Sequence, residues 1–274
     1  MDKYLESFEI FGKKEIVGYT RLGREIPLFH GSDKKANVLL VGGVHAREHI
    51  TCELLKKLFS AEGKGLAIDY LPILNIDGVL LCKYGSASVK NVFLRQNLVR
   101  LNGGSEDFSQ WKANAYGVDI NVNFDADWGE GRYNETTPGT ANYIGASPAS
   151  EPETQCAVNV LKRQYSLVVS YHSLGEEVYW GYENNFLHYK EAKKYADGLG
   201  YVLKRSENSC GGLKDYYALN YGGLGLTVEI GEEKYGHPYP EDKLDLITVK
   251  HRGSLKELCE TGDKIYAKLH GGSN

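Results

Sequence analysis

The chain has 274 residues, 42% of them hydrophobic and 25% charged, a composition ordinary for a folded globular protein. Its formal net charge of −4 and its lack of a dense lysine and arginine run argue against a nucleic-acid partner. No segment reaches the ~18 continuous apolar residues that a membrane span needs, and the acid-bearing start has no signal-peptide core. The five cysteines are scattered, without a CxxC pair, which argues against a disulfide scaffold or a cysteine-ligated zinc. We therefore expect a cytoplasmic protein, with export by another route left open.

Short apolar runs alternate with amphipathic segments along the chain. Residues 36–45 form an apolar run that ends in glycines, the pattern of a buried strand, and residues 48–60 repeat apolar side chains at helical spacing. Further strands are expected at 65–74, 165–172 and 223–231, and helices at 151–165, 184–200 and 243–270, the last with a break near Gly253. Ser150 and Glu153 have the spacing of a capping box. The alternation predicts one α/β domain, residues 1–274, with a mostly parallel or mixed sheet covered on both faces.

Four side chains with catalytic chemistry lie at or near the ends of predicted strands. His45 and Glu48 follow the first strand, His172 ends another, and Glu229 lies near the end of the last. Active sites in such sheets lie beyond the carboxyl ends of the strands. Three protein ligands with an open position for water are typical of catalytic zinc, so His45, Glu48 and His172 are candidate ligands of one Zn²⁺ ion. Glu229 is then a candidate general base. By itself, the HxxE of His45 and Glu48 would also fit the start of a helix, where the helix dipole favours a glutamate in the first turn.

The motifs around these residues occur in a specific order. After HxxE come "NIDG" (75–78), "FLRQN" (93–97), "GVDINVNF" (117–124), "SYHS" (170–173) and "TVEIG" (227–231). Together they resemble the zinc carboxypeptidase family, over about residues 36–232. The resemblance implies an α/β fold in which a mixed eight-stranded sheet is flanked by helices.

The resemblance also implies a role for each matching residue. His45, Glu48 and His172 would bind zinc, and Glu229 would activate the zinc-bound water that attacks the amide carbonyl. The other matches are Arg95, which would polarise the scissile carbonyl and stabilise the oxyanion; Arg47, which would line the substrate groove; Asn121, which would help to bind a terminal carboxylate; and Asp119, which would orient His45.

Two departures from the family pattern point to a changed specificity. The carboxylate-binding pair is usually Asn-Arg, but here Val122 follows Asn121, and valine cannot bind a carboxylate bidentately. The tyrosine that often caps the substrate in digestive members has no clear match.

One bacterial branch of the family shows this combination. The segments "YHSLGEEVYWGY" (171–182) and "CGGLKDYY" (210–217) resemble peptidases that hydrolyse γ-D-glutamyl–diamino acid bonds in cell-wall peptides. The diamino acid is meso-diaminopimelate or lysine, and the partner of the enzyme would be a muropeptide stem. In this branch Lys214 would replace an apolar specificity residue and pair with a substrate carboxylate, such as the α-carboxylate of the D-glutamate. Arg132 could supply a second cationic contact.

Three other functions remain open from the sequence. An ordinary metallocarboxypeptidase would release a C-terminal amino acid, but Val122 weighs against it. An aspartoacylase-type amidohydrolase also uses HxxE and a distant histidine, but "GVDINVNF" and "GGLKDYY" favour the peptidase branch. A non-catalytic peptidoglycan-binding module would need neither Arg95 nor Glu229.

Overall fold

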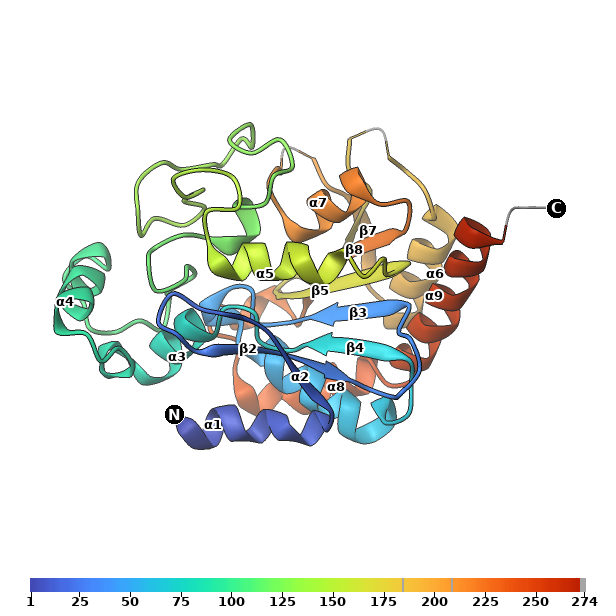
Figure 1. The fold of residues 1–274 in the computed structure, drawn as a ribbon, viewed down its shortest axis with the longest axis horizontal. Helices are drawn as coiled ribbons and strands as arrows, with labels where there is room; N and C mark the ends of the chain where they lie inside the picture. The colour runs from blue at the N-terminus through green and yellow to red at the C-terminus, as the bar shows by residue number, and fades with distance from the viewer. Residues whose placement is uncertain (184, 208, 272–274) are drawn as a thin grey trace.

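One mixed sheet of eight strands organises the part of the chain that the structure, a computed structural model, describes: residues 1–183, 185–207 and 209–271. The spatial order is β1-β2-β4-β3-β5-β8-β6-β7 (Figure 1). The pairs β3–β4, β3–β5, β5–β8 and β6–β7 are parallel, while β1–β2, β2–β4 and β6–β8 are antiparallel. The strands are β1 (Lys14–Tyr19), β2 (Glu25–His30), β3 (Val38–Val41), β4 (Ile68–Leu71), β5 (Leu167–Ser173), β6 (Glu177–Trp180), β7 (Val202–Arg205) and β8 (Leu224–Ile230).

Helices cover both faces of the sheet. In Figure 1, α5 and α7 lie on one side of the strands and α2 and α8 on the other, while α6 and α9 pack together near the C-terminus. The helix bounds are α1 (Asp2–Glu6), α2 (Ile50–Leu58), α3 (Ile76–Tyr84), α4 (Val92–Leu101), α5 (Pro152–Leu161), α6 (Tyr189–Leu199), α7 (Leu213–Asn220), α8 (Leu244–Lys250) and α9 (Ser254–His270). The expected mixed eight-stranded α/β fold is confirmed.

The central strands are buried on both faces because helices lie above and below them. Every residue of β3, β4 and β5 is buried, and each of these strands overlaps a segment that the sequence predicts as a strand. The edge strands β1 and β7 are largely exposed or half-buried, and their mixed pattern gives no comparable signal. The main core cluster spans both sides of the sheet and fixes the strand ends that position the site.

Several predicted boundaries need correction. The closing helix does break at Gly253, into α8 and α9, but the helix expected at 184–200 begins only at Tyr189. The capping box at α5 is wrong, because Glu151 is the N-cap and makes no side-chain cap. The Ser150 hydroxyl bonds instead to the Glu151 carboxylate, and Glu153 faces Asn114. Among the described residues, no helix combines the length and the apolar character needed to cross a membrane.

Candidate active site

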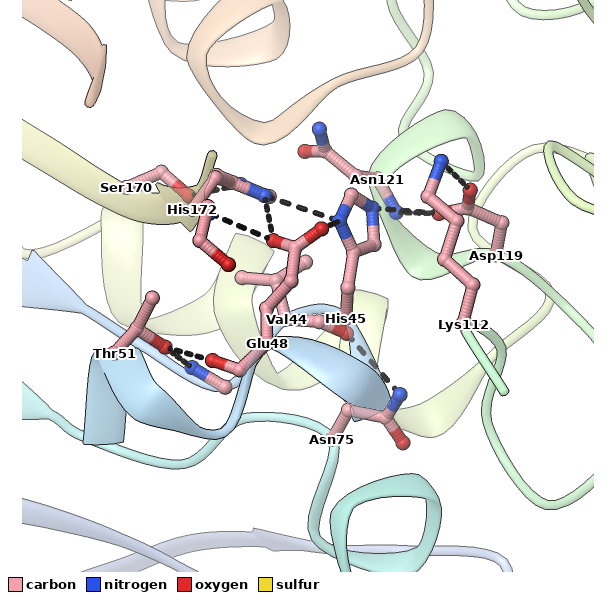
Figure 2. A network of polar contacts seen from close by, with 12 residues as sticks. Val44, His45, Glu48, Thr51, Asn75, Lys112, Asp119, Asn121, Ser170 and His172 are labelled. Atoms are coloured by element: carbon pink, nitrogen blue, oxygen red, sulfur yellow. Dashed lines mark hydrogen bonds and ion pairs between the residues drawn. The ribbon is translucent and has the colours of Figure 1, made fainter. Parts of the chain in front are cut away.

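A braced turn after β3 presents the first two candidate ligands. His45 adopts extended backbone and precedes a 3-10 turn over Ala46–Glu48. The Thr51 hydroxyl donates to the Glu48 carbonyl at 2.8 Å and accepts from the Gly43 amide at 2.9 Å. The Asn75 amide donates to the Val44 carbonyl at 3.1 Å, which ties the turn to the start of α3 (Figure 2). The side chains of His45 and Glu48 are therefore held by a rigid backbone.

His45, Glu48 and His172 converge on one point, as Figure 2 shows. His45 Nδ1 lies 2.9 Å from Glu48 Oε1 and 3.2 Å from His172 Nδ1, and His172 Nδ1 lies 3.1 Å from Glu48 Oε2. The ligand atoms of a tetrahedral zinc ion with bonds of ~2.1 Å are about 3.4 Å apart. Two imidazole nitrogens and the two oxygens of one carboxylate lie at nearly this spacing, so the three residues fit a single zinc ion.

A second layer of polar groups fixes the two imidazoles. His45 Nε2 lies 3.1 Å from Asp119 Oδ1, and His172 Nε2 lies 2.9 Å from the Ser170 hydroxyl. Each imidazole thus turns its Nδ1 toward the cluster, because its other nitrogen is already bonded. Asp119 is fully buried, and its Oδ1 also accepts a hydrogen bond from the backbone N–H of Asn121 at 3.0 Å. This arrangement matches the orienting role that the sequence predicts for Asp119.

Glu229 reaches the same site from the neighbouring strand. His172 and Glu229 are paired residues of the parallel strands β5 and β8, so their side chains lie on the same face of the sheet. Burial and the nearby Glu48 carboxylate raise the pKa of Glu229 to about 8, although His45 and Lys112 act to lower it. A carboxyl group with a pKa near neutrality can take up and release a proton during a reaction.

The pKa values of the buried groups in the cluster depend on one another. Burial lowers the pKa of His45, but Glu48 and Asp119 outweigh it and raise this pKa to about 9. Burial lowers the pKa of His172. Despite burial, the pKa of Glu48 is well below its usual range because both imidazoles stabilise the carboxylate. The cluster therefore combines an ionised carboxylate with two histidines, a donor set suited to a divalent cation.

Lys112, which belongs to none of the predicted motifs, places a cation beside the cluster. Its ammonium lies 2.7 Å from Asp119 Oδ2 and donates to Asn142 Oδ1 at 2.7 Å. Its carbonyl accepts from the Ala46 amide at 3.0 Å, so its segment runs beside the zinc-ligand turn. Lys112 influences the pKa of His45, His172 and Glu229 alike. The only sequence signal was its position shortly before the "GVDINVNF" motif.

Arg95 lies elsewhere. It belongs to α4, which projects from the body of the molecule in Figure 1. Its Nε and Nη2 both donate to the Val89 carbonyl, at 3.2 and 2.8 Å. The structure therefore does not bring Arg95 to the His45–Glu48–His172 cluster, and a role at the oxyanion is not supported by this geometry.

Two of the four predicted substrate-binding residues line a cavity of about 270 Å³ beside Glu229. Asn121 and Lys214 line it directly. Arg132 is exposed and lies 5.5 Å from the ring centre of Tyr133, which also lines the cavity. Arg47 is half-buried in the zinc-ligand turn, and among the described residues its Nε has no hydrogen-bond partner.

Lys214 is more enclosed than the sequence suggests. Its side chain is 4% exposed, and its Nζ donates to the Gly181 carbonyl at 2.7 Å and to Asp215 Oδ1 at 2.5 Å. Lys214 is therefore one half of a buried ion pair in the cavity wall, not an isolated cation.

Two further histidines lie near the cluster. His237 follows β8 in the chain and is half-buried, and the charges that act on its pKa include those of Glu48, Arg47 and His45. Its carbonyl accepts from the Gln110 side chain at 2.5 Å, which links the loop after β8 to the Lys112 segment. His49 lies 3.6 Å from Glu241 Oε1 and is not among the described residues that form the candidate metal cluster.

Comparisons with known proteins agree with this geometry. The gamma-D-glutamyl-L-diamino acid endopeptidase 1 of Lysinibacillus sphaericus is 34% identical over 186 residues, which cover 66% of this chain and 46% of the relative. The chain thus aligns with just under half the length of that relative.

Two solved structures share the fold. Bovine thrombin-activatable fibrinolysis inhibitor, solved with tick carboxypeptidase inhibitor, superposes with a TM-score of 0.74 at 18% identity, covering 97% of this chain and 96% of the other. Murein-tripeptide amidase MpaA from Escherichia coli O157 superposes with a TM-score of 0.60 at 22% identity, covering 90% of this chain and 92% of the other. The zinc carboxypeptidase family matches residues 1–252. With a cluster of His45, Glu48 and His172 that fits a single zinc ion, this chain belongs to the zinc carboxypeptidase family.

Proposed function

We propose that residues 1–274 form one catalytic domain, a zinc metallopeptidase that hydrolyses the γ-D-glutamyl–diamino acid bond of bacterial cell-wall peptides. The observation that carries the substrate assignment is the Lys214–Asp215 ion pair in the wall of the cavity beside Glu229. A charged pair there suits a substrate residue that itself bears charges. The 34% identical relative is named for cleavage of such bonds, which supports the same substrate class.

An ordinary carboxypeptidase fits the cavity less well. Asn121 is followed by Val122, and a valine side chain has no donor for the terminal carboxylate of an ordinary carboxypeptidase substrate. The family match also favours a peptidase over an aspartoacylase-type amidohydrolase. The position of Glu229 beside His172, on the same face of the sheet as the candidate metal ligand, favours catalysis over mere binding, because a binding module needs no general base.

Each residue of the site has its own role in the proposed reaction. His45, Glu48 and His172 would hold the zinc ion, which when bound polarises a carbonyl and lowers the pKa of a nearby water. Glu229 takes a proton from the attacking water and passes it to the leaving nitrogen of the amide. Asp119 keeps His45 in one orientation. Lys112, rather than Arg95, stabilises the negative charge that develops on the carbonyl oxygen, since its segment runs beside the zinc-ligand turn and its ammonium lies next to Asp119, whereas Arg95 bonds to the Val89 carbonyl.

The remaining predicted contacts stay proposals of the same kind. Arg47 and Arg132 would contact the substrate from the turn and from the loop beside Tyr133, and Asn121 would contact it from the cavity wall. We propose the cytoplasm as the compartment, supported by five cysteines that are unpaired in the structure.

A digest followed by mass spectrometry tests the proposal. One substrate is L-Ala-γ-D-Glu-meso-diaminopimelate, the other an α-linked peptide with a free C-terminus, and each is run with and without a zinc chelator. We expect chelator-sensitive cleavage of the first at the γ-D-glutamyl bond. Cleavage of the second alone would replace this proposal with an ordinary metallocarboxypeptidase.

A further inference from the structure

The outer edge of β7 lies beside a second cavity. β7 is the last strand in the order of the sheet, and among the described residues no strand pairs with its outer side. The cavity next to it has a volume of about 440 Å³, larger than the one beside Glu229. It is bounded by β7 itself, by Trp180 at the end of β6, and by Tyr189 and Lys193 of α6. In the part of the chain that the structure describes, the two cavities share no lining residue, so this face is separate from the candidate active site.

The backbone of β7 presents hydrogen-bonding groups on its outer edge. The Val202 amide donates to the Glu176 carbonyl at 3.2 Å, so this amide points toward the β6 side. The direction of the amides and carbonyls alternates along a strand, so those of Leu203 and Arg205 point away from β6. The edge therefore offers a short row of donors and acceptors to one more extended strand.

Apolar side chains are exposed around this edge. Val202 is 59% exposed and Tyr189 is 50% exposed, and Phe186, 38% exposed, packs against Trp180 with ring centres 5.7 Å apart. The Trp180 indole N–H donates to the Leu187 carbonyl at 2.8 Å, which ties this loop to the sheet. A single exposed apolar side chain is ordinary, but a group of them beside an unpaired strand marks an interaction surface.

The wall of this cavity is basic. Lys193, Lys204 and Arg205 line it, and no aspartate or glutamate among the described residues does, although the whole chain has a net charge of −4. The Arg205 guanidinium lies 4.0 Å from the ring centre of Phe186, and a guanidinium stacked on a ring keeps the N–H groups at its edge for an acceptor. The two lysines make ion pairs with acids outside the wall, but both pairs are partly exposed and therefore weak. A segment that binds here is therefore one that carries acidic side chains.

A second copy of this chain matches the edge poorly. Antiparallel pairing of β7 with itself would bring Lys204 and Arg205 of one chain close to the same residues of the other, and like charges across a strand pair are destabilising. Cations on an edge strand commonly prevent such self-pairing. The same cations attract an acidic strand.

We propose that β7 is a docking edge for an acidic, extended segment of another protein, which adds to the sheet as a further strand. The backbone of the segment would pair with Leu203 and Arg205, its acidic side chains would bind Lys204 and Arg205, and an apolar side chain would pack on Tyr189 in the cavity. Strand addition of this kind derives affinity from main-chain hydrogen bonds and specificity from the side-chain contacts. The interaction is independent of the proposed peptidase function.

Fluorescence anisotropy with a synthetic peptide tests the proposal. The probe is fluorescein-labelled Asp-Phe-Glu-Val-Asp-Phe, which as a strand has acidic side chains on one face and apolar side chains on the other. One control peptide has lysine in place of every acid, and another has every backbone amide N-methylated. We expect the wild-type protein to bind the probe at least about 10-fold more tightly than either control, because each control lacks one class of contact. Equal binding of the N-methylated peptide would overturn strand addition, equal binding of the lysine peptide would overturn the charge assignment, and failure to bind the probe would overturn both.

Two variants locate the binding on the β7 edge. Arg205→Glu and Tyr189→Ala should each bind the probe about 10-fold more weakly, the first because a charge at the edge is reversed and the second because the apolar contact is lost. Lys90→Glu changes an exposed lysine before α4 and is the matched control, which should bind the probe like the wild type. If Arg205→Glu binds the probe as tightly as Lys90→Glu does, the proposal is wrong, and the control peptides test it with the wild-type protein even if a variant does not fold. A wild-type dimer in sedimentation velocity that is lost when the probe is added would instead assign the edge to a second copy of this chain.

Discussion

Lys112 and Arg95 show that spacing along the sequence does not by itself predict which cationic side chain reaches the site. Arg95 matches a family motif, yet its guanidinium is bonded to the Val89 carbonyl. Lys112 belongs to no predicted motif, yet it lies 2.7 Å from Asp119 and influences the pKa values of both candidate zinc-binding histidines. The course of the loop between α4 and the "GVDINVNF" segment decides which cation reaches the site, and no periodic pattern encodes that course.

The roles of these two cations can be separated by mutation. Lys112→Met should lower kcat by about 10²–10³-fold, the usual effect of removing one group that stabilises a developing oxyanion. Arg95→Ala should change kcat less than 3-fold by our estimate, because the guanidinium stabilises only its own loop. The measurement is steady-state kinetics on the γ-D-glutamyl substrate.

Lys112→Arg serves as the control, since it keeps the charge and should recover part of the lost activity. If Lys112→Met is as active as the wild type while Arg95→Ala is not, the original family assignment of Arg95 is correct.

At the scale of elements, the turn after β3 depends on a glycine that admits no side chain. Gly43 has φ +58°, and a Cβ there would lie 2.7 Å from Cys52 Sγ and 3.2 Å from the Cα of Ile73. The turn can therefore approach α2 closely enough to aim His45 and Glu48 together. The glycines of "VGGVH" are visible in the sequence, but the neighbours that require them are not.

Gly43→Ala should lower the free energy of unfolding by about 2–4 kcal/mol, from left-handed strain and overpacking together. Gly200→Ala provides the comparison, because Gly200 is left-handed at φ +71° but a Cβ there would meet nothing within 4 Å. This control substitution should lower the free energy of unfolding by only about 1–2 kcal/mol. Urea unfolding of the metal-free proteins measures both, and equal losses would show that the contact with Cys52 and Ile73 is unimportant.

The start of α5 contains a buried acid that links stability to pH. Burial, with the nearby Asp77 and Glu151 carboxylates, raises the pKa of Glu153 to about 7, against a usual value of 4.5. The folded state therefore binds the proton more tightly than the unfolded state. The contribution of Glu153 protonation to the free energy of unfolding is fully present below pH 4.5 and is lost as the pH rises through 7.

Glu153→Gln should remove this dependence, because glutamine stays neutral at every pH. We expect the variant to be more stable than the wild type by about 1–3 kcal/mol at pH 8 and nearly equal to it at pH 4. Thermal unfolding at the two pH values measures the difference. A variant that is equally destabilised at both would indicate that the Glu153 carboxylate makes a needed hydrogen bond.

For the whole molecule, the sequence predicts the centre of the sheet better than its edges. His45 follows the buried strand β3 in the chain, and His172 and Glu229 each lie one residue before the end of β5 and β8. These strands contain enough apolar residues to be identified from the sequence. The edge strands β1 and β7 expose much of their surface and have no clear pattern. The cluster of candidate zinc ligands was therefore predictable, because its position depends on the central strands.

The specificity cavity was only partly predictable. The sequence indicates Lys214 as a substrate contact, and Asp215 is its neighbour in the chain, but the Gly181 carbonyl that also binds its ammonium comes from the distant segment after β6. Burial turned an expected free cation into half of a neutral pair. That burial depends on contacts between distant segments, which a single sequence does not show.

The measurement that tests the account most directly is zinc content and kcat/KM on the γ-D-glutamyl tripeptide, for the wild type, Glu229→Gln and His172→Ala. We predict one zinc ion per chain for the wild type and for Glu229→Gln, with kcat/KM lower in Glu229→Gln by about 10²–10⁴-fold, the contribution of a general base. His172→Ala should lose both zinc and activity. A Glu229→Gln enzyme as active as the wild type, or a His172→Ala protein that retains its zinc, would contradict the site described for this chain.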